Sequence, residues 1–293
     1  MGEGCRHLAG ACQRTQLMRF LALNLQAPLA SFGGTAVDHY GITRPFPAAS
    51  MLTGLLGNAL GYQRSETEKL TELQERLIFG AFYRETCPEQ IRDYQTVQLR
   101  GETSWTTDGT RAERKGASGD STHIRYRDYL TDLDLYIVLT LMPAEKSPTL
   151  DNLVQALERP ARPLSLGRKT CLPSEPLLLP PALRFQEAAT PAEAALNLAG
   201  ALPFRKREKE AEAKKRNRNT SPAIHLMRPA LPAERGLTDT GAHPPAGLAT
   251  ITDERNWQGG FHGGSRQIVI EKLPVRTELS EKETTIGVSG EPT

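Results

Sequence analysis

Leucine and alanine recur at helical spacing in two segments of the first third of the chain. In the first, which follows residues 47–50, apolar side chains occupy positions i, i+3, i+4, i+7 and i+8, as they do on one face of a helix. These are Leu52, Leu55, Leu56, Ala59 and Leu60. The second segment, residues 66–79, has Leu70, Leu73 and Leu77 on one side, a Glu72/Arg76 pair at i, i+4, and Gly80 as its stop. We interpret both helices as core scaffold.

Other segments predict strands. Residues 19–25 (RFLALNL) form a short, mostly apolar strand that breaks at Gln26-Ala27-Pro28, and residues 93–99 (DYQTVQL) are rich in β formers. Residues 132–142 (DLDLYIVLTLM) predict a longer strand, in which alternate apolar residues share a face: Leu133, Leu135, Ile137, Leu139 and Leu141. A short helix over 149–158 follows it, and residues 266–273 predict a final strand.

The order of these elements indicates an α+β fold. A strand, a helix with a second helix beside it, a strand, an insertion, a strand and a helix follow one another along the chain. This order matches the ferredoxin-like βαββαβ plan, in which two helices cover one side of a sheet. We therefore expect a core domain over residues 18–186.

The remaining segments differ in composition from this core. Residues 1–17 have no periodicity and are interpreted as an upstream start or a disordered extension. Residues 187–250 are rich in alanine, proline and charge, and are interpreted as a low-complexity charged insertion. Within it, RKREKEAEAKKRNRN (Arg205 to Asn219) has eight cations against three acids, which fits either a solvated surface or an arm that attracts phosphates. Residues 251–293 supply the final strand and a polar tail.

Composition excludes several classes of protein. The 293 residues are 38% hydrophobic and carry a net charge of +2, so any basic surface must be local. No apolar run approaches the roughly 18 residues of a membrane span, and no signal peptide is recognisable, which together indicate a cytoplasmic protein. The four cysteines contain no CxxC pair, and no Walker-type loop or carboxylate cluster is visible. We expect no metal and no cofactor.

Two local patterns point to RNA. Residues 100–127 combine cations, Trp105 and Tyr126 with glycine and serine, a composition typical of either an ordinary surface hairpin or a flexible protrusion that binds single-stranded RNA. The stretch SLGRKTCLPSEPL (165–177) places Gly167 beside Arg168 and Lys169. Glycine lets an anion approach the backbone and the cations supply charge, although a plain surface turn has the same pattern.

The loop after the first strand could add a third contact. Gln26, Ser31, Phe32 and Gly33 leave that strand and precede the first helix, which the pattern starts near Ser50. The free amides of the helix N-terminus form a possible anion seat, or Ser50 is only an N-cap. Arg44 stands close by in sequence and either serves RNA or pairs with an acid.

Five segments in order resemble one family of proteins, the CasD subunits of type I-E Cascade, a CRISPR surveillance complex. They are LNLQAPLASFG (23–33), PAASMLTGLLGNALGY (47–62), IRDYQTV (91–97), HIRYRDYLTD (123–132) and PLSLGRKTCLPSEPL (163–177). The resemblance spans roughly residues 18–180 and weakens over the charged insertion.

The resemblance implies a non-catalytic RNA-binding subunit with a modified RNA-recognition-motif (RRM) core and a β-hairpin thumb, here residues 98–127. Such a subunit holds the 5′ handle of the CRISPR RNA (crRNA), contacts the backbone subunit and the large subunit, and meets target DNA only through the complex. The implied phosphate contacts in the thumb are Arg100, Arg111, Arg114, Lys115, Arg125 and Arg127, with Tyr126 stacking on a base. The resemblance also favours the phosphate interpretation of Gly167, Arg168 and Lys169.

An enzyme is the alternative. In the related type I-C system the equivalent subunit cuts precursor crRNA with a tyrosine, a lysine and a histidine, without metal. The matching residue types here are Tyr40 or His39, Lys115 and His123. Such cleavage needs a base near a 2′-hydroxyl and a cation on the scissile phosphate, whereas a lone histidine at a hairpin base is more often a plain surface residue.

Overall fold

The computed structural model describes residues 17–34, 39–84, 87–98, 103–105, 111–113, 122–203, 223–235 and 247–275. These ranges contain the strands β1 (Met18–Ala30), β2 (Tyr40–Gly41), β3 (Leu77–Tyr83), β4 (Gln90–Gln98), β5 (Thr103–Trp105), β6 (Arg111–Glu113), β7 (Thr122–Leu141), β8 (Phe185–Ala188), β9 (Ala223–Pro229), β10 (Leu248–Ile251) and β11 (Arg266–Pro274). The helices are α1 (Ala49–Ala59), α2 (Thr67–Arg76), α3 (Leu150–Glu158) and α4 (Pro191–Ala201).

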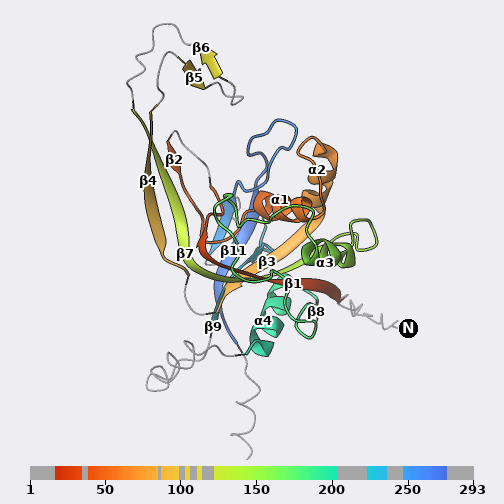
Figure 1. Cartoon of the computed structure of the whole chain (residues 1–293). Coiled ribbons are helices and arrows are strands. Elements are labelled where there is room, and N and C mark those ends of the chain that lie inside the picture. The colour runs from red at the N-terminus through yellow and green to blue at the C-terminus, as the bar shows by residue number, and fades with distance from the viewer. Residues whose placement is uncertain are drawn as a thin grey trace, which may run out of the picture.

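A large sheet in the order β10-β11-β9-β3-β7-β1-β8 forms the body of the molecule, and each neighbouring pair in it is antiparallel. The 20-residue strand β7 has two parts. Its second half pairs with β1 and β3 inside the body, and its first half pairs with β4 and, in parallel, with the short β2. Strands β4 and β7 project from the body as a two-stranded arm, with the β5–β6 ribbon beyond its end (Figure 1).

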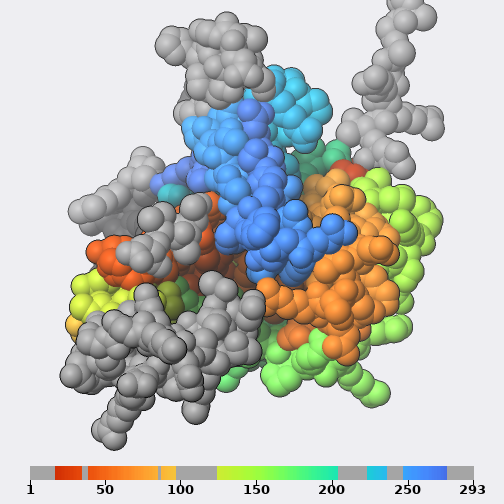
Figure 2. Space-filling view, turned by 90° about the horizontal axis from the view of Figure 1, so that it is seen from above, coloured from red at the N-terminus to blue at the C-terminus, as the bar shows by residue number. Residues whose placement is uncertain are grey.

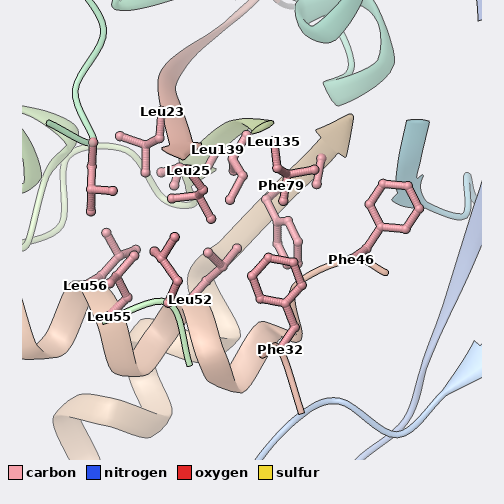
Figure 3. Packing of buried hydrophobic residues seen from close by; sticks show 14 of the residues in the cluster. Leu23, Leu25, Phe32, Phe46, Leu52, Leu55, Leu56, Phe79, Leu135 and Leu139 are labelled. Carbon is pink, nitrogen blue, oxygen red and sulfur yellow. The ribbon is translucent and has the colours of Figure 1, made fainter. Parts of the chain in front are cut away.

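One face of the sheet carries the main hydrophobic core. Helices α1, α2 and α3 lie on this side (Figure 1), and the predicted leucine face of α1 packs onto β1 and β7 (Figure 3). The alternate apolar residues predicted for the long strand are all in this cluster, so that interpretation is confirmed. The predicted helix over 149–158 is present as α3, and Thr149 caps it, because its hydroxyl accepts the Asn152 N–H at 3.3 Å.

Helix α4 covers the other face of the sheet and builds a second cluster with Phe20, Phe82 and Tyr136. The interpretation of residues 187–250 as an irregular charged insertion is therefore wrong for α4 and β9, which are buried elements. Alanines of α4 let the helix lie close to the sheet, and a reading based on composition takes such alanines for low complexity. The basic run 205–219 lies outside the described residues.

The first strand is longer than the sequence predicts. It continues through Gln26 and Ala27 to Ala30, and the pairing with β7 passes from Ala27↔Leu133 to Leu29↔Thr131. Pro28 has no N–H to donate, and it lies opposite Asp132, whose φ is 47°. The proline thus marks an irregularity in the ladder and not the end of the strand.

The second predicted helix is too long. Helix α2 ends at Arg76, and the chain enters β3 at once, so Gly80 lies within a strand. The predicted ion pair is present, with Arg76 Nη1 and Glu72 Oε1 3.6 Å apart. The buried Arg76 guanidinium also donates to carbonyls of the 143–148 loop. Strand β3 is the second strand of the body, whereas the predicted strand at 93–99 corresponds to β4 of the arm.

The segment between β10 and β11 returns to α1 and α2. Figure 2 shows this C-terminal part, in blue, packed beside the orange region that contains both helices. The buried carboxylate of Asp253 accepts the Ala49 N–H at 3.0 Å, and Gln74 of α2 bonds both the N–H and the carbonyl of Arg255. These contacts hold residues 253–257 against α1 and α2. None of the helices in the described ranges is both long and apolar enough to cross a bilayer.

Candidate nucleic-acid interface

A groove of about 890 Å³ lies where the loop after β1, helix α1, the 162–172 loop and the 255–257 segment meet. It brings together seven of the predicted contact residues: Ser31, Phe32, Gly33, Ser50, Gly167, Arg168 and Lys169. They come from three segments that are far apart in the sequence, and the fold places all three on one groove. Its apolar floor includes Leu55 and Leu70.

The lining of this groove is strongly basic. Five cations line it, namely Arg64, Arg162, Arg168, Lys169 and Arg255, and the described residues that line it include no carboxylate. The whole chain has nearly balanced charge, so this segregation creates a local positive field. Such a groove favours an anion with an apolar part, and a nucleotide is one.

The glycine of the 165–177 stretch is required by a backbone contact. Gly167 has φ +95°, and a Cβ on it would lie 1.6 Å from the carbonyl oxygen of Ser31. The adjacent carbonyl of Leu166 accepts the Ser31 N–H at 3.1 Å. The loop is thus hydrogen-bonded to the end of β1, and glycine is the residue that permits the loop backbone to lie so close to the Ser31 carbonyl.

The two cations of that stretch have different environments. Arg168 donates to the carbonyl oxygens of Asp128 and Gly41, at 2.9 and 2.8 Å, and its guanidinium lies 4.7 Å from the centre of the Tyr129 ring. Lys169 is exposed, and no acidic group among the described residues pairs with it. Arg168 therefore ties the groove to the base of the arm, whereas Lys169 points its charge at solvent.

The start of α1 differs from the predicted anion seat. The N-cap is Ala48, and Ser50 is the second residue of the helix. The Asp253 carboxylate accepts the Ala49 N–H, and the main-chain carbonyl of Asp253 accepts the Ser50 N–H at 3.0 Å. An acidic residue of the chain itself therefore occupies this helix N-terminus. Arg44 donates to the carbonyl of Thr252 at 3.1 Å and thus also braces the C-terminal segment.

Aromatic side chains gather at the base of the arm. Tyr40 and Tyr126 stack with ring centres 5.0 Å apart, while His39 lies beside Tyr40 and Tyr94 beside Tyr126. Tyr40 is 40% and Tyr94 55% exposed, so the cluster presents ring surface to solvent.

An ion pair supports this cluster. Arg92 of β4 forms two hydrogen bonds to the Asp128 carboxylate, at 2.7 and 3.1 Å, and its guanidinium lies 5.6 Å from the centre of the Tyr40 ring. The hydrogen bond from Arg92 lowers the pKa of Asp128, although burial of this carboxyl opposes the shift. Asp128 therefore stays ionised and holds Arg92 over the rings.

The predicted arm contacts are described in part. The side chains of Arg125 and Arg127 are half-buried on β7, and a Cβ on Gly41 would lie 2.7 Å from Nη1 of Arg127. Arg111 lies in β6 and His123 in β7, at positions whose side chains are not described, and Arg100, Arg114 and Lys115 lie outside the described residues. Of the enzyme alternative, Tyr40 and His39 are thus placed, at the arm base, without the other members. The described residues contain no group of three or more His, Cys, Asp or Glu that could hold a metal ion.

Among the groove residues that sequence reasoning missed are three arginines and a tryptophan: Arg64, Arg162, Arg255 and Trp257. Arg162 donates to the carbonyls of Gly61 and Tyr62, at 3.0 and 2.8 Å, and so fixes the turn after α1. Arg255 and Trp257 lie in a glycine-rich segment near the C-terminus, where neither periodicity nor spacing links them to α1. Only the fold brings them together.

The fold is a mixed α/β fold with a large antiparallel sheet, and it is similar to that of a chain in a solved CRISPR complex. A structure described as a CRISPR RNA-guided surveillance complex matches with a TM-score of 0.58 and 21% identity, covering 87% of this chain and 90% of that chain. The family model for the CRISPR-associated protein family Cas5 matches residues 20–262. The chain belongs to this family. It is 32% identical, over 61% of its length and 76% of the relative, to the CRISPR system Cascade subunit CasD of Escherichia coli (strain K12).

Proposed function

We propose that this protein is the crRNA-binding subunit of a Cascade-type complex, in which it holds the 5′ handle without cutting it. The single observation that carries the proposal is the groove with five cations and no carboxylate among its described lining residues. Single-stranded RNA offers such a groove a row of phosphates and unstacked bases. The similarity to CasD supports the same assignment.

The core is proposed to be an RRM-like βαββαβ unit made of β1, α1, β3, β7, α3 and β8. The sheet order β8-β1-β7-β3, with α1 and α3 on one face, supports it. The β4–β7 arm is then the base of the thumb. We propose that the handle passes from the groove to the arm base, since Arg168 contacts both.

The arm is also the proposed contact with the backbone subunit, and the large subunit is the second proposed neighbour. Ile91, Tyr94 and Ile124 are 45%, 55% and 38% exposed on this arm. Large apolar side chains on a two-stranded projection favour burial against another protein chain. Target DNA meets this chain only through the assembled complex.

The test uses the full chain with single-stranded RNA of the CRISPR repeat, in EDTA, which silences contaminating metal nucleases. We expect a gel shift and intact RNA. Replacing Arg111, Arg114 and Lys115 by alanine should lower the log–log salt slope of binding by about two. Absence of binding would refute the proposal. Cleavage at the repeat that is lost in Tyr40→Phe or His123→Ala would instead establish the endoribonuclease.

A further inference from the structure

Two arginines from distant parts of the chain converge at one end of the groove. Arg64 lies in the turn between α1 and α2, and Arg255 precedes the glycine-rich segment before β11. A Cβ on Gly260 would lie 3.8 Å from Nη2 of Arg64 and 3.9 Å from Nη2 of Arg255. Both guanidinium groups therefore reach the same small volume beside Gly260.

The two guanidinium groups carry like charges, and no acidic residue in the described part of the chain pairs with either of them. Arg64 is exposed and forms no ion pair with a described residue, and the Arg255 guanidinium donates, among the described residues, to the carbonyl of Gly260 at 2.7 Å. Burial, and after it the charge of Arg64, lowers the pKa of Arg255. A bound anion would offset the repulsion between the two groups.

The other groove cations are already used or lie elsewhere. Arg162 and Arg168 donate to backbone carbonyls and so serve the fold. Lys169 lies on the 162–172 loop, a segment of the groove other than those that carry Arg64 and Arg255. Arg64 and Arg255 are thus the pair with donor capacity left at this end.

An aromatic ring lies beside the pair. Trp257 lines the groove, packs near Gly54 of α1, and has the Arg255 guanidinium 5.5 Å from its ring centre. Its indole N–H is buried and has no acceptor among the described residues. Ring surface and an unused donor next to two cations suit the base and sugar that adjoin a phosphate.

We propose that Arg64 and Arg255 bind one phosphodiester of single-stranded RNA, with the neighbouring nucleoside against Trp257. The inference rests on the proposed function and assigns a specific subsite within it. Two bidentate guanidinium groups match the geometry of a phosphate, which a lysine meets only as a point charge.

The test compares charge-matched variants of the full chain with repeat-derived single-stranded RNA at several salt concentrations. Arg64→Ala/Arg255→Ala should lose at least tenfold in affinity and lower the log–log salt slope by about 0.7, which corresponds to one fewer neutralised phosphate. The control, Arg19→Ala/Lys272→Ala, removes the same charge away from the groove, and its slope should stay that of the wild type. Arg64→Lys/Arg255→Lys should keep the slope and recover only part of the affinity.

A second measurement does not depend on removing a buried side chain. In a Trp105→Phe background, Trp257 is the remaining tryptophan, and its fluorescence should change when RNA saturates the chain. Arg64→Ala alone, at an exposed position, should weaken that response in parallel with affinity. Wild-type binding with a double variant equal to its control would overturn the subsite and leave the proposed function standing. Failure of the wild type to bind RNA would overturn both.

Discussion

Arg168 Nη2 donates a hydrogen bond to the carbonyl oxygen of Gly41 across 2.8 Å, and so joins the groove loop to strand β2. Its other terminal nitrogen bonds the carbonyl of Asp128, at the point where the arm leaves the body. One side chain therefore connects the wall of the groove with both strands at the arm base.

Arg168→Ala and Lys169→Ala remove the same charge but should differ in what they impair: the first should lower stability, and the second should lower RNA affinity. Arg168→Ala removes two charge-assisted hydrogen bonds and a ring contact, and should cost about 2–4 kcal/mol of unfolding free energy. Lys169→Ala should change stability by less than about 0.5 kcal/mol but weaken RNA binding. Urea unfolding measures the first quantity and filter binding the second. Equal losses of stability would contradict this division of roles.

Gly167→Ala should be far more harmful than Gly33→Ala, although both glycines have positive φ. At Gly33, with φ +74°, a Cβ meets nothing within 4 Å, so only the backbone strain of about 1–2 kcal/mol applies. At Gly167 the Cβ also collides with the Ser31 carbonyl, and the cost should exceed about 4 kcal/mol. Denaturant midpoints compare the two variants, and similar midpoints would show that the loop can move away from β1.

Asp253→Ala should be strongly destabilising because it leaves the start of α1 and Arg266 without their acceptor. The Asp253 carboxylate is fully buried and lies 2.7 Å from Arg266 Nη2. Breaking such a buried pair costs about 3–5 kcal/mol. The control is Asp151→Ala, whose pair with Arg19 is 43% and 66% exposed and should contribute less than about 1 kcal/mol. Thermal unfolding of both variants checks the difference, which would vanish if water replaced the Asp253 carboxylate.

The Glu234–Arg228 pair should make stability depend on acid pH. The hydrogen bond from Arg228, 2.7 Å long, lowers the pKa of Glu234 from 4.5 to about 2. Because the folded-state pKa is the lower one, this stabilisation, of about 3 kcal/mol, is complete above pH 4.5 and is lost as the pH falls toward 2. Glu234→Gln should flatten the acid limb of the pH–stability curve. An unchanged limb would show that the pair is not retained in solution.

Much of the core could be predicted because periodicity survives folding. The leucine faces of α1 and of the long strand follow from local spacing alone. The boundary between α2 and β3 could not be predicted from the sequence, because Leu77 continues the leucine repeat of α2 although it is the first residue of β3. Nothing local separates these two readings, and the pairing of β3 with β7 decides between them.

The residues of the groove could be predicted from the sequence only where they lie close together along the chain. The glycine-arginine-lysine loop and the residues after β1 could be proposed as neighbours of RNA, and the fold does bring them to one groove. Arg64, Arg255 and Trp257 could not, because tertiary contacts made by Asp253 and Gln74 bring the segment that holds Arg255 and Trp257 to the helices on either side of Arg64. The role of Gly167 was likewise hidden, since the backbone it approaches is that of Ser31.

Strand β7 is shared by the body and the arm, and this limits how the arm can change in length. Arg92 lies opposite Asp128 and Tyr94 opposite Tyr126, so one pleated face of the arm carries the part of the ring cluster that β4 and β7 supply. A single residue inserted between Asp128 and Leu133 would turn that cluster to the opposite side while the body kept its register. Insertions and deletions in the arm strands should therefore be tolerated in steps of two residues. The arm strands can therefore change in length only by an even number of residues, and insertions or deletions of an odd number are confined to the tip of the arm.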